Sequence, residues 1–462
     1  GAAGTASSIA GLPIYVDSSS NSVYTHDVSG TDNSADNNTA FGLNAADAIT
    51  TADSVTVFGR SAGSAITTGS SSTFFGKEAG LAVTEGTNNI LMGVNAGHSL
   101  TTGGSNIGIG ATVLDGCDTE SNNIAIGRDS LGGSSLAGGE FNVCVGNYTG
   151  DAITSGDSNV MVGHKAGSGT TTGAYNVFIG GSYASFCGFG NTTGSNNIAI
   201  GTDAYDVADT ENHNLAIGHV ALGGSVAGGE YNVGIGNYTL QSLTSGDSST
   251  CVGYAAGSAI TTGTENTCFG ESAGAGITEG VANICIGQNS GAHGVSITTG
   301  SNNIFIGEKT SAGTNSNSNQ IVIGSEGTTG KGSNTGFINP NGGAVYQGNN
   351  STSWSQTSDI RIKKNIKDNN TGLDAINKIR VRNFEYRTLE EITDFDNPKS
   401  AVVKKEGTQL GAIAQEIEEI LPDLITETSQ GVKTLDADNL TWYLINAVKE
   451  LSKEVNKLKE DK

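Results

Sequence analysis

The chain has little of several residue types that mark familiar protein classes. Its 462 residues contain only 4 prolines, 6 cysteines and 15% charged residues. The cysteines form no C-x-x-C pair and no cluster with histidine at zinc-binding spacing, so we expect neither a disulfide scaffold nor a metal site. No run approaches the about 18 apolar residues of a membrane-spanning helix. A phosphate-binding G-K-[ST] loop is also missing, and we expect no cofactor.

Basic residues are scarce and unevenly placed. The chain has 23 Lys and Arg against 46 Asp and Glu, a net charge of -23. Residues 358–462 hold 17 of the basic and 20 of the acidic residues, which leaves residues 1–357 with 6 and 26, a net charge of -20. Glycine divides in the same way, with 4 of 69 after residue 357. Two segments of different composition therefore join near residue 357. Because residues 1–357 are strongly acidic, they repel nucleic acid and anionic membranes, and we expect neither as a partner.

The abundant feature is a repeat of about 17 residues. Its signature is Asn, apolar, small or apolar, apolar, Gly, as in NIAIG at 123–127 and NIFIG at 303–307. Twelve of the sixteen intervals between closing glycines are 17 residues, and the others are 18 to 21. The closing glycines are Gly42, Gly59, Gly76, Gly93, Gly110, Gly127, Gly146, Gly163, Gly180, Gly201, Gly218, Gly236, Gly253, Gly270, Gly287, Gly307 and Gly324. Such a period predicts a solenoid.

The chemistry of one unit predicts a mostly β fold. A short β-branched run closed by glycine is typical of a strand that ends in a turn. A second run, such as SAITTG at 64–69, predicts a second short strand in each coil. Helical periodicity is absent. We therefore expect a β-solenoid or β-roll shaft, and seventeen coils at a strand spacing of ~4.8 Å give a rod of roughly 80 Å.

Asparagine stands four positions before the closing glycine in 13 of 17 units, for example at Asn106 and Asn159. Stacked amides can form a hydrogen-bond ladder along a solenoid. A row of ligands for glycan or metal is the functional alternative.

The middle residue of each strand is also apolar or small. Alternation predicts that the flanking residues fill the coil and that this middle residue faces outward. A continuous apolar stripe on the outside favours packing against copies of the same chain. The trimer contacts predicted on this basis are Cys251, Cys268 and Cys285. The repeat resembles the β-roll heads of trimeric autotransporter adhesins, which have a similar strand at a shorter period.

The longest insertion, at 181–194, places Tyr183, Phe186 and Phe189 outside the regular pattern. These aromatics are candidates for receptor contact, and filling a gap between coils is the alternative. The carboxylates of the shaft, such as Asp157 and Asp247, lie in turns without the mutual placement of a glycosidase pair. We expect no activity on an external substrate.

Two helices are predicted after residue 357. GAIAQEIEEILPDLI at 411–425 has an amphipathic pattern that stops near Pro422. Residues 440–462 form a stronger pattern with a 4-3-4-3 apolar spacing, which indicates a coiled-coil seam at a trimer contact. The seam residues are Leu444, Val448, Leu451, Val455 and Leu458. The alternative is a single helix that docks on its own domain.

Residues 358–462 resemble a known domain type. The motifs SDIRIKKNI at 358–366, VRNFEYR at 381–387 and GAIAQEI at 411–417, followed by an amphipathic helix, are similar to the self-cleaving intramolecular chaperone of phage tail spikes and fibres. Endosialidases and the myelin regulatory factor family carry the same domain type. The segment KTLDADNL at 433–440 departs from the family pattern. The resemblance implies trimers whose chaperone domain assembles the fibre and then cuts itself off.

The same resemblance implies a Ser-Lys dyad. Ser358 is the implied nucleophile and Lys363 the base, which requires a lysine left neutral by burial. Supporting residues are Asp359, Arg361 and Asn365. The alternation of Ile360 and Ile362 with charged residues predicts a strand, on which the dyad residues would face opposite sides, so a bend or a partner subunit must unite them. We expect cleavage at Thr357–Ser358, because the hydroxyl reaches the preceding carbonyl through a five-membered ring; Ser358–Asp359 is the alternative bond.

The whole sequence then divides into an N-terminal connector at 1–30, a β-solenoid shaft at 31–325, a Gly/Asn-rich transition at 326–357 and a small α+β chaperone and autoprotease domain at 358–462 that ends in a coiled-coil helix. We expect a homotrimeric viral fibre or spike that binds a host cell-surface glycan or protein receptor. Its N-terminus would join the virion tail, after assembly in the host cytoplasm. A bacterial trimeric surface adhesin with a permanent trimerisation domain is the alternative.

Overall fold

The computed structural model describes residues 5–461, except 10–11, 18–19, 26–33, 134–135, 340–344, 348–353, 356–359, 394–401, 404 and 428–430. The chain forms two compact units, Gly1–Thr357 and Ser358–Lys462. The division falls where glycine content and charge change along the sequence.

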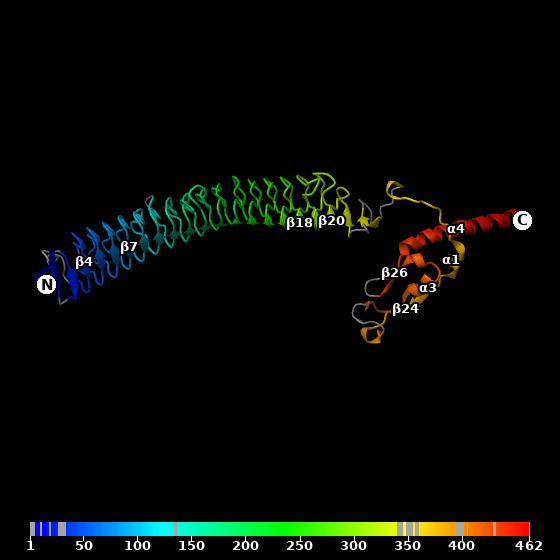
Figure 1. The fold of residues 1–462 in the computed structure, drawn as a ribbon, viewed down its shortest axis with the longest axis horizontal. Coiled ribbons are helices and arrows are strands. Elements are labelled where there is room, and N and C mark those ends of the chain that lie inside the picture. Colours follow the sequence, from blue (N-terminus) through cyan, green and yellow to red (C-terminus); the bar gives the residue numbers. More distant parts are fainter. Residues whose placement is uncertain are drawn as a thin grey trace. The chain divides into compact units, whose positions relative to one another are not determined.

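The first unit is a parallel β-solenoid with one three- or four-residue strand in each coil (Figure 1). Neighbouring strands pair in register, so that each position of one strand lies beside the same position of the next. The stacked strands are β4 (Thr39–Phe41), β5 (Thr56–Phe58), β6 (Thr73–Phe75), β7 (Ile90–Met92), β8 (Ile107–Ile109), β9 (Ile124–Ile126), β10 (Val143–Val145), β11 (Val160–Val162), β12 (Val177–Ile179), β13 (Ile198–Ile200), β14 (Leu215–Ile217), β15 (Val233–Ile235), β16 (Thr250–Val252), β17 (Thr267–Phe269), β18 (Ile284–Ile286), β19 (Ile304–Ile306) and β20 (Ile321–Gly324). The β-solenoid predicted from the 17-residue period is confirmed.

Further strands cap both ends of this stack. β1 (Thr5–Ile9), β2 (Leu12–Asp17) and β3 (Ser22–Tyr24) form antiparallel pairs, and β3 joins β4 in parallel. At the other end β21 (Gly336–Asn339) pairs in parallel with β20, and β22 (Val345–Gln347) and β23 (Trp354–Ser355) continue as antiparallel strands. Regular β structure therefore extends into both the connector and the transition segment.

The second strand expected in each coil is absent from the described coils. Residues 64–69 form turns instead, with Ile66 donating its backbone N–H to Gly63 at 3.1 Å. Thr67 donates to the carbonyl of Thr84 in the next coil at 3.0 Å. Because only Ile66 is buried in this run as a large side chain, the backbone turns around it rather than extending along a second sheet.

The predicted orientation of the strands is wrong. The middle residue of each strand lies inside the coil, and the two flanking residues face outward: Cys285 is fully buried, whereas Ile286 is 39% exposed. Cys251, Cys268 and Cys285 therefore line the core of their own chain and do not contact a partner from the surface. When all three positions are apolar, alternation gives two opposite faces but does not say which one is inside.

The asparagine column is a buried ladder. The amide oxygen of Asn142 accepts the backbone N–H of Asn159 at 3.0 Å, and Asn159 accepts that of Asn176 at 3.0 Å. Each amide nitrogen donates across the next coil, as from Asn159 to the Gly173 carbonyl at 2.9 Å. Since these side chains are fully buried, they bind the coils together and cannot serve as a surface row of ligands.

The closing glycines allow the coils to approach closely. Gly93 has φ of 143°, in a region that glycine favours. A Cβ on Gly93 would overlap the carbonyl oxygen of Gly110 in the next coil. The repeat therefore needs glycine here both for its dihedral angle and for its lack of a side chain.

The second unit is a small α+β domain with a core of its own. Its elements are η1 (Ile360–Ile362), α1 (Leu373–Lys378), β24 (Arg382–Phe384), η2 (Leu389–Glu391), β25 (Gln409–Gly411), α3 (Ala414–Glu418), η3 (Pro422–Leu424), β26 (Ile425–Glu427), β27 (Lys433–Leu435) and α4 (Ala437–Glu460). Buried Ala375, Ile417, Leu421, Leu424 and Tyr443 form the centre of the core.

The helix predicted at 411–425 is shorter than expected. Gly411 belongs to β25, α3 spans only Ala414–Glu418, and Pro422 begins the separate turn η3. Pro422 cannot donate a backbone hydrogen bond, so it fits the first position of a new turn. The final helix is confirmed and begins earlier than predicted, at Ala437, where the Asp436 side chain caps it by accepting the Asn439 N–H at 3.0 Å.

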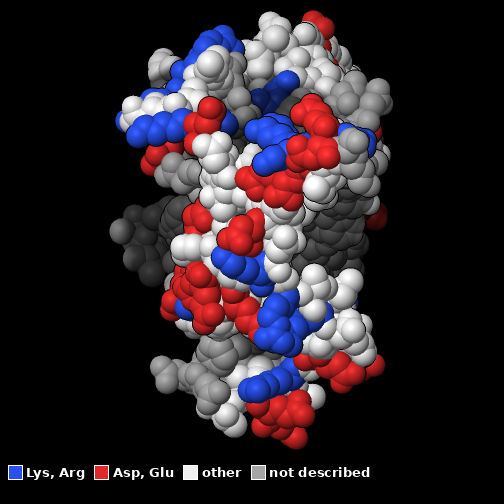
Figure 2. All heavy atoms as spheres, turned by 90° about the vertical axis from the view of Figure 1, so that its right-hand side faces the viewer, with Lys and Arg blue, Asp and Glu red and all other residues white. Residues whose placement is uncertain are grey.

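Charges of both signs are interspersed on the face that Figure 2 turns toward the viewer. None of the helices in the described part of the chain combines the length and apolarity that crossing a bilayer requires.

Candidate functional site

The predicted cleavage junction lies at the start of the second unit. Thr357, Ser358 and Asp359 are outside the described residues, so the predicted nucleophile and its bond remain predictions. The expected strand is wrong: Ile360–Ile362 forms the 3-10 turn η1, and Lys363 donates its backbone N–H to the Ile360 carbonyl at 3.2 Å.

The predicted base and two of the supporting residues near the junction face solvent. Arg361, Lys363 and Asn365 are exposed, and Asn365 adopts a left-handed φ of 55°, which asparagine tolerates. A lysine becomes a base where burial leaves it neutral. In the single chain the Lys363 side chain is exposed and not buried.

Two of the motifs that carry the resemblance meet in the structure. β24 and β25 pair antiparallel, with Arg382 beside Gly411. Arg382 then forms a two-pronged ion pair with Glu416 at the start of α3, with Nε to Oε2 at 3.2 Å, and Arg380 lies 3.8 Å from the same carboxylate. The hydrogen bond from Arg382 lowers the pKa of Glu416. This pair ties VRNFEYR to GAIAQEI and orients the domain's sheet and helix.

One face of α4 holds the helix to its own domain. Tyr443 and Ala447 are buried, and the Tyr443 hydroxyl donates to Asp423, which raises the pKa of Tyr443. Further along the helix, Glu450 accepts the backbone N–H of Leu373 at 2.6 Å. Asn446 donates to the carbonyl of Asn369 at 2.7 Å.

A neighbouring face of α4, about a quarter turn around the helix, carries the predicted seam and is exposed. All five seam side chains lie at the surface: Leu444, Val448, Leu451, Val455 and Leu458. The helix therefore docks on its own domain through residues other than the seam. The seam itself is uncovered in the single chain. Five exposed apolar side chains in one line on a charged helix are typical of an unassembled coiled coil.

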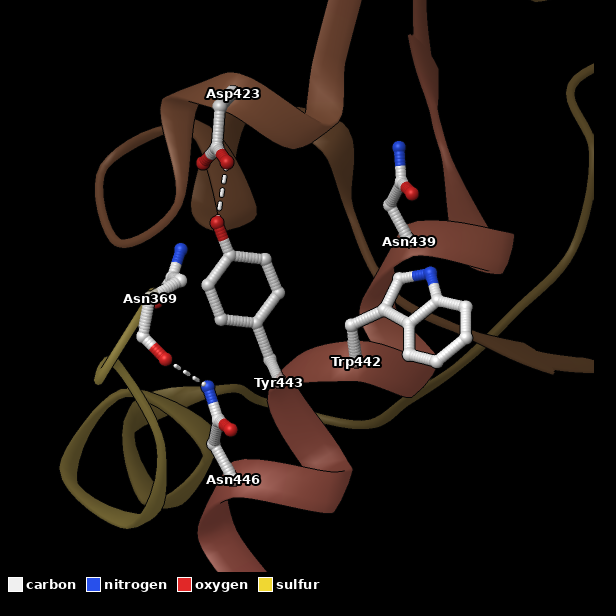
Figure 3. A pocket seen from close by; sticks show the side chains of 6 residues that line it. All are labelled: Asn369, Asp423, Asn439, Trp442, Tyr443 and Asn446. Atoms are coloured by element: carbon white, nitrogen blue, oxygen red, sulfur yellow. Dashed lines mark hydrogen bonds between the residues drawn. The ribbon is translucent and has the colours of Figure 1, made fainter. Parts of the chain in front are cut away.

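A pocket of about 280 Å³ opens beside the first turns of α4 (Figure 3). It is lined by Asn369, Asp423, Asn439, Trp442, Tyr443 and Asn446. Trp442 is 65% exposed, next to buried Tyr443. Sequence reasoning missed this pocket, and the adjacent Trp-Tyr pair at the start of a polar helix was its only local signal, because Asn369 and Asp423 come from distant segments.

The shaft insertion brings its aromatics to the surface. Tyr183 is 91% exposed, while Phe186 and Phe189 have ring centroids 4.9 Å apart. His164 of the preceding coil lies 6.2 Å from Tyr183 and 6.4 Å from Phe186. Cys187 in the same insertion points into the core. Cys187 therefore fills the interior of this coil, and the aromatic rings of the insertion lie outside that interior.

The outer face of the solenoid sheet carries the apolar stripe. Its exposed members occupy the first and third strand positions and include Phe41, Phe58, Phe75, Ile90, Met92, Ile109, Ile126, Ile179, Ile198, Phe269, Ile286, Ile306 and Ile321. Phe41, Phe58 and Phe75 stack with centroids 4.9 and 5.1 Å apart. An outer apolar stripe therefore exists, but it consists of the first and third residues of the strands and not of the middle residues from which it was predicted.

Comparison with known proteins identifies one segment. Residues 358–426 match the family described as Chaperone of endosialidase. This segment contains the junction, both paired motifs and α3, and it supports the resemblance to a fibre with a self-cleaving endosialidase-type chaperone. No curated protein and no solved structure matches the chain.

Proposed function

We propose that the chain is one subunit of a homotrimeric, phage-type tail fibre or spike. The solenoid is the shaft, and residues 358–462 are a chaperone that aligns three chains and then cleaves itself off beside Ser358. The observation that carries the proposal is the division of α4 into a face bound to its own domain and an exposed apolar seam.

Three seams can bury one another. In a trimeric coiled coil the seam residues leave water together, and each buried Leu or Val contributes about 1.5–3 kcal/mol. Because the other face of α4 is held by Tyr443, Asn446 and Glu450, each seam is fixed relative to its domain. Assembly would therefore also set the positions of the three domains.

The outer stripe of the shaft supports the same assembly. Exposed isoleucine or phenylalanine flanks the strand in twelve of the seventeen coils, and this row is larger than a soluble single chain ordinarily leaves uncovered. Identical coils can pair one repeat out of register, which makes unaided assembly slow and error-prone. A clamp at one end chooses the register, and its removal afterwards makes the reverse reaction kinetically difficult.

The proposed cleavage uses Ser358 and Lys363. The Ser358 Oγ attacks the Thr357 carbonyl carbon while Lys363 takes the hydroxyl proton, and the Ser358 nitrogen leaves with that proton. The resulting ester is hydrolysed by water, which restores the hydroxyl and gives a Thr357 carboxylate. Lys363 is exposed in the single chain, so we infer that a partner subunit completes its desolvation and makes cleavage depend on assembly.

Intact mass under denaturing conditions tests this chemistry. We expect the native sequence to give two fragments divided beside Ser358, and Ser358→Ala and Lys363→Gln to stay whole. Ser355→Ala is the matched control and should cleave like the native chain. If the native chain forms a trimer and stays at full length, the domain is a permanent cap, which is the arrangement expected of the bacterial surface adhesin.

We further propose that the fibre serves host attachment, with its N-terminal end joined to the virion. The exposed insertion aromatics Tyr183 and Phe189, with half-buried Phe186 beside them, support a receptor site on the shaft. Adsorption assays test this: the isolated shaft should compete with intact particles for host cells, and a shaft that does not compete would contradict the attachment role.

A further inference from the structure

Aromatic rings and cations gather at one corner of the shaft, which we call the corner patch. It consists of Arg128, Tyr148, His164, Lys165, Tyr183, Phe186 and Phe189. We propose that the corner patch binds a polysaccharide that carries carboxylate groups, of the uronic-acid kind. The inference rests on the proposed attachment function and gives the receptor its chemistry.

Successive coils place these residues in one row. Arg128, Tyr148 and Lys165 each follow a closing glycine by one or two positions, so they occupy the same corner. Neighbouring coils are separated by ~4.8 Å. The Tyr148 and His164 ring centroids are 6.0 Å apart, and the row continues from His164 to Phe186.

The insertion adds exposed rings that the coil does not need. The interval from Gly180 to Gly201 is 21 residues, whereas most coils close in 17. The extra length carries Tyr183, whose 91% exposure gives it almost no role in packing. An aromatic side chain held in solvent beside other rings indicates a surface for a ligand.

Cations concentrate at the same corner. Residues 1–357 contain only six Lys and Arg, and two of them lie here. The Arg128 Cζ is 4.8 Å from the centre of the Tyr148 ring, and the Lys165 Nζ is 5.3 Å from that of Phe186. Arg128 Nε also lies 3.6 Å from the Asp129 carboxylate.

The other shaft cations do not form a comparable group. Arg60 and Lys77 pair with Glu78, Lys309 pairs with Glu308, and Lys331 lies over the single ring of Phe337, whereas Lys165 lies over both Tyr148 and Phe186. Residues 1–357, with a net charge of -20, repel an anionic polymer along most of their length. The corner patch offers such a polymer both cations and ring faces.

The shape of the patch favours a saccharide over an acidic peptide. Tyr183 is 91% and Phe189 41% exposed, so both rings are open to a ligand at the surface. Sugar rings present C–H faces that pack on aromatic faces, while their carboxylates meet Arg128 and Lys165. A linear chain of such sugars can follow the row from coil to coil.

Calorimetric titration of the full chain with polygalacturonate at low salt tests the proposal. We expect saturable binding that weakens with added salt, because the ligand is anionic. Lys165→Gln and Tyr183→Ala should each weaken it about tenfold or more. The matched control is Tyr254→Ala, in the separate Tyr238–Tyr254 pair with ring centroids 5.7 Å apart, which should bind normally.

Methyl-esterified polygalacturonate, which keeps the sugar and loses the charge, should bind at least tenfold more weakly. Equal binding of the ester, absence of binding, or tighter binding of poly-L-glutamate would each overturn the inference. Intact mass and particle mass of the same preparations separate the two proposals: a cleaving trimer that ignores polygalacturonate contradicts only the ligand, and a binding chain that stays single and whole contradicts the fibre.

Discussion

Individual residues hold the shaft together through repeated contacts between coils. The side chain of Asn159 accepts one backbone N–H and donates to one carbonyl, and the same geometry recurs along the column. Ser249 occupies the position in one coil and keeps only the acceptor role, toward Asn266 N at 3.2 Å. The ladder therefore contributes by satisfying buried backbone groups that would otherwise lack partners.

Asn159→Ala should destabilise the central coils by about 1–3 kcal/mol, because it leaves the Asn176 N–H unpaired in the core. Asn159→Ser retains an acceptor, as Ser249 does, and should cost clearly less. Hydrogen exchange of the Asn176 amide measures the difference. Equal exchange in both variants would show that the amide ladder does not stabilise the stack.

Asp206 lies beside the shaft insertion, where its carbonyl accepts the Gly190 N–H at 2.7 Å. Burial, and then the charge of Asp203, raise the pKa of Asp206 to about 6 from 3.8. The folded shaft thus favours the protonated acid. This contribution to stability is present below pH about 4 and is lost as pH rises through about 6.

Asp206→Asn should therefore raise the unfolding temperature at pH 7.5 and change it little at pH 4. The measurement at pH 4 provides the internal comparison, because the other carboxyl groups titrate in both proteins. Thermal unfolding at the two pH values is the measurement, and an equal shift at both would contradict the role given to burial.

At the scale of elements, the sequence predicts which strands and helices form better than it predicts which face of a strand is buried. The 17-residue period predicted the stacked strands β4–β20, and the 4-3-4-3 apolar spacing predicted the seam of α4. It could not decide whether Cys285 or Ile286 is inside, because both are apolar and a shift of one residue reverses the faces. The run Ile360–Ile362 is too short for alternation to separate a strand from a 3-10 turn.

The candidate site was likewise predicted only in part. Local motifs pointed to the junction and to the seam, whereas the Arg382–Glu416 pair and the Trp442 pocket arise from tertiary contacts between distant segments. Such contacts leave no periodic mark in one sequence. The patch around Tyr183 was only partly visible, since Tyr148 and Lys165 belong to coils that are otherwise regular.

The seam of α4 gives an element-scale prediction. Leu451→Lys places a charge in the apolar line and should convert the assembled protein to single chains, because burying the charge costs more than the seam gains. Cleavage beside Ser358 should fall with it. Ser452→Lys, one position away and also exposed, is the control and should leave the particle mass unchanged. Light scattering after gel filtration measures the particle mass of both variants. Single chains for both variants would contradict a specific role of the apolar seam in assembly.

At the scale of the whole molecule, the two units differ in what they contribute. Residues 1–357 have a net charge of -20 and stack by backbone ladders, while residues 358–462 are near neutral and end in an uncovered helix face. A long stack of like repeats lacks a unique register, and the second unit offers the means to set one. The family match at residues 358–426 agrees with that division of labour.

The native mass of the full-length Ser358→Ala chain tests the central claim most directly, since this variant keeps chaperone and shaft together. The account predicts a particle of three chains, three times 46.7 kDa. A single chain of 46.7 kDa that is folded and soluble would contradict it.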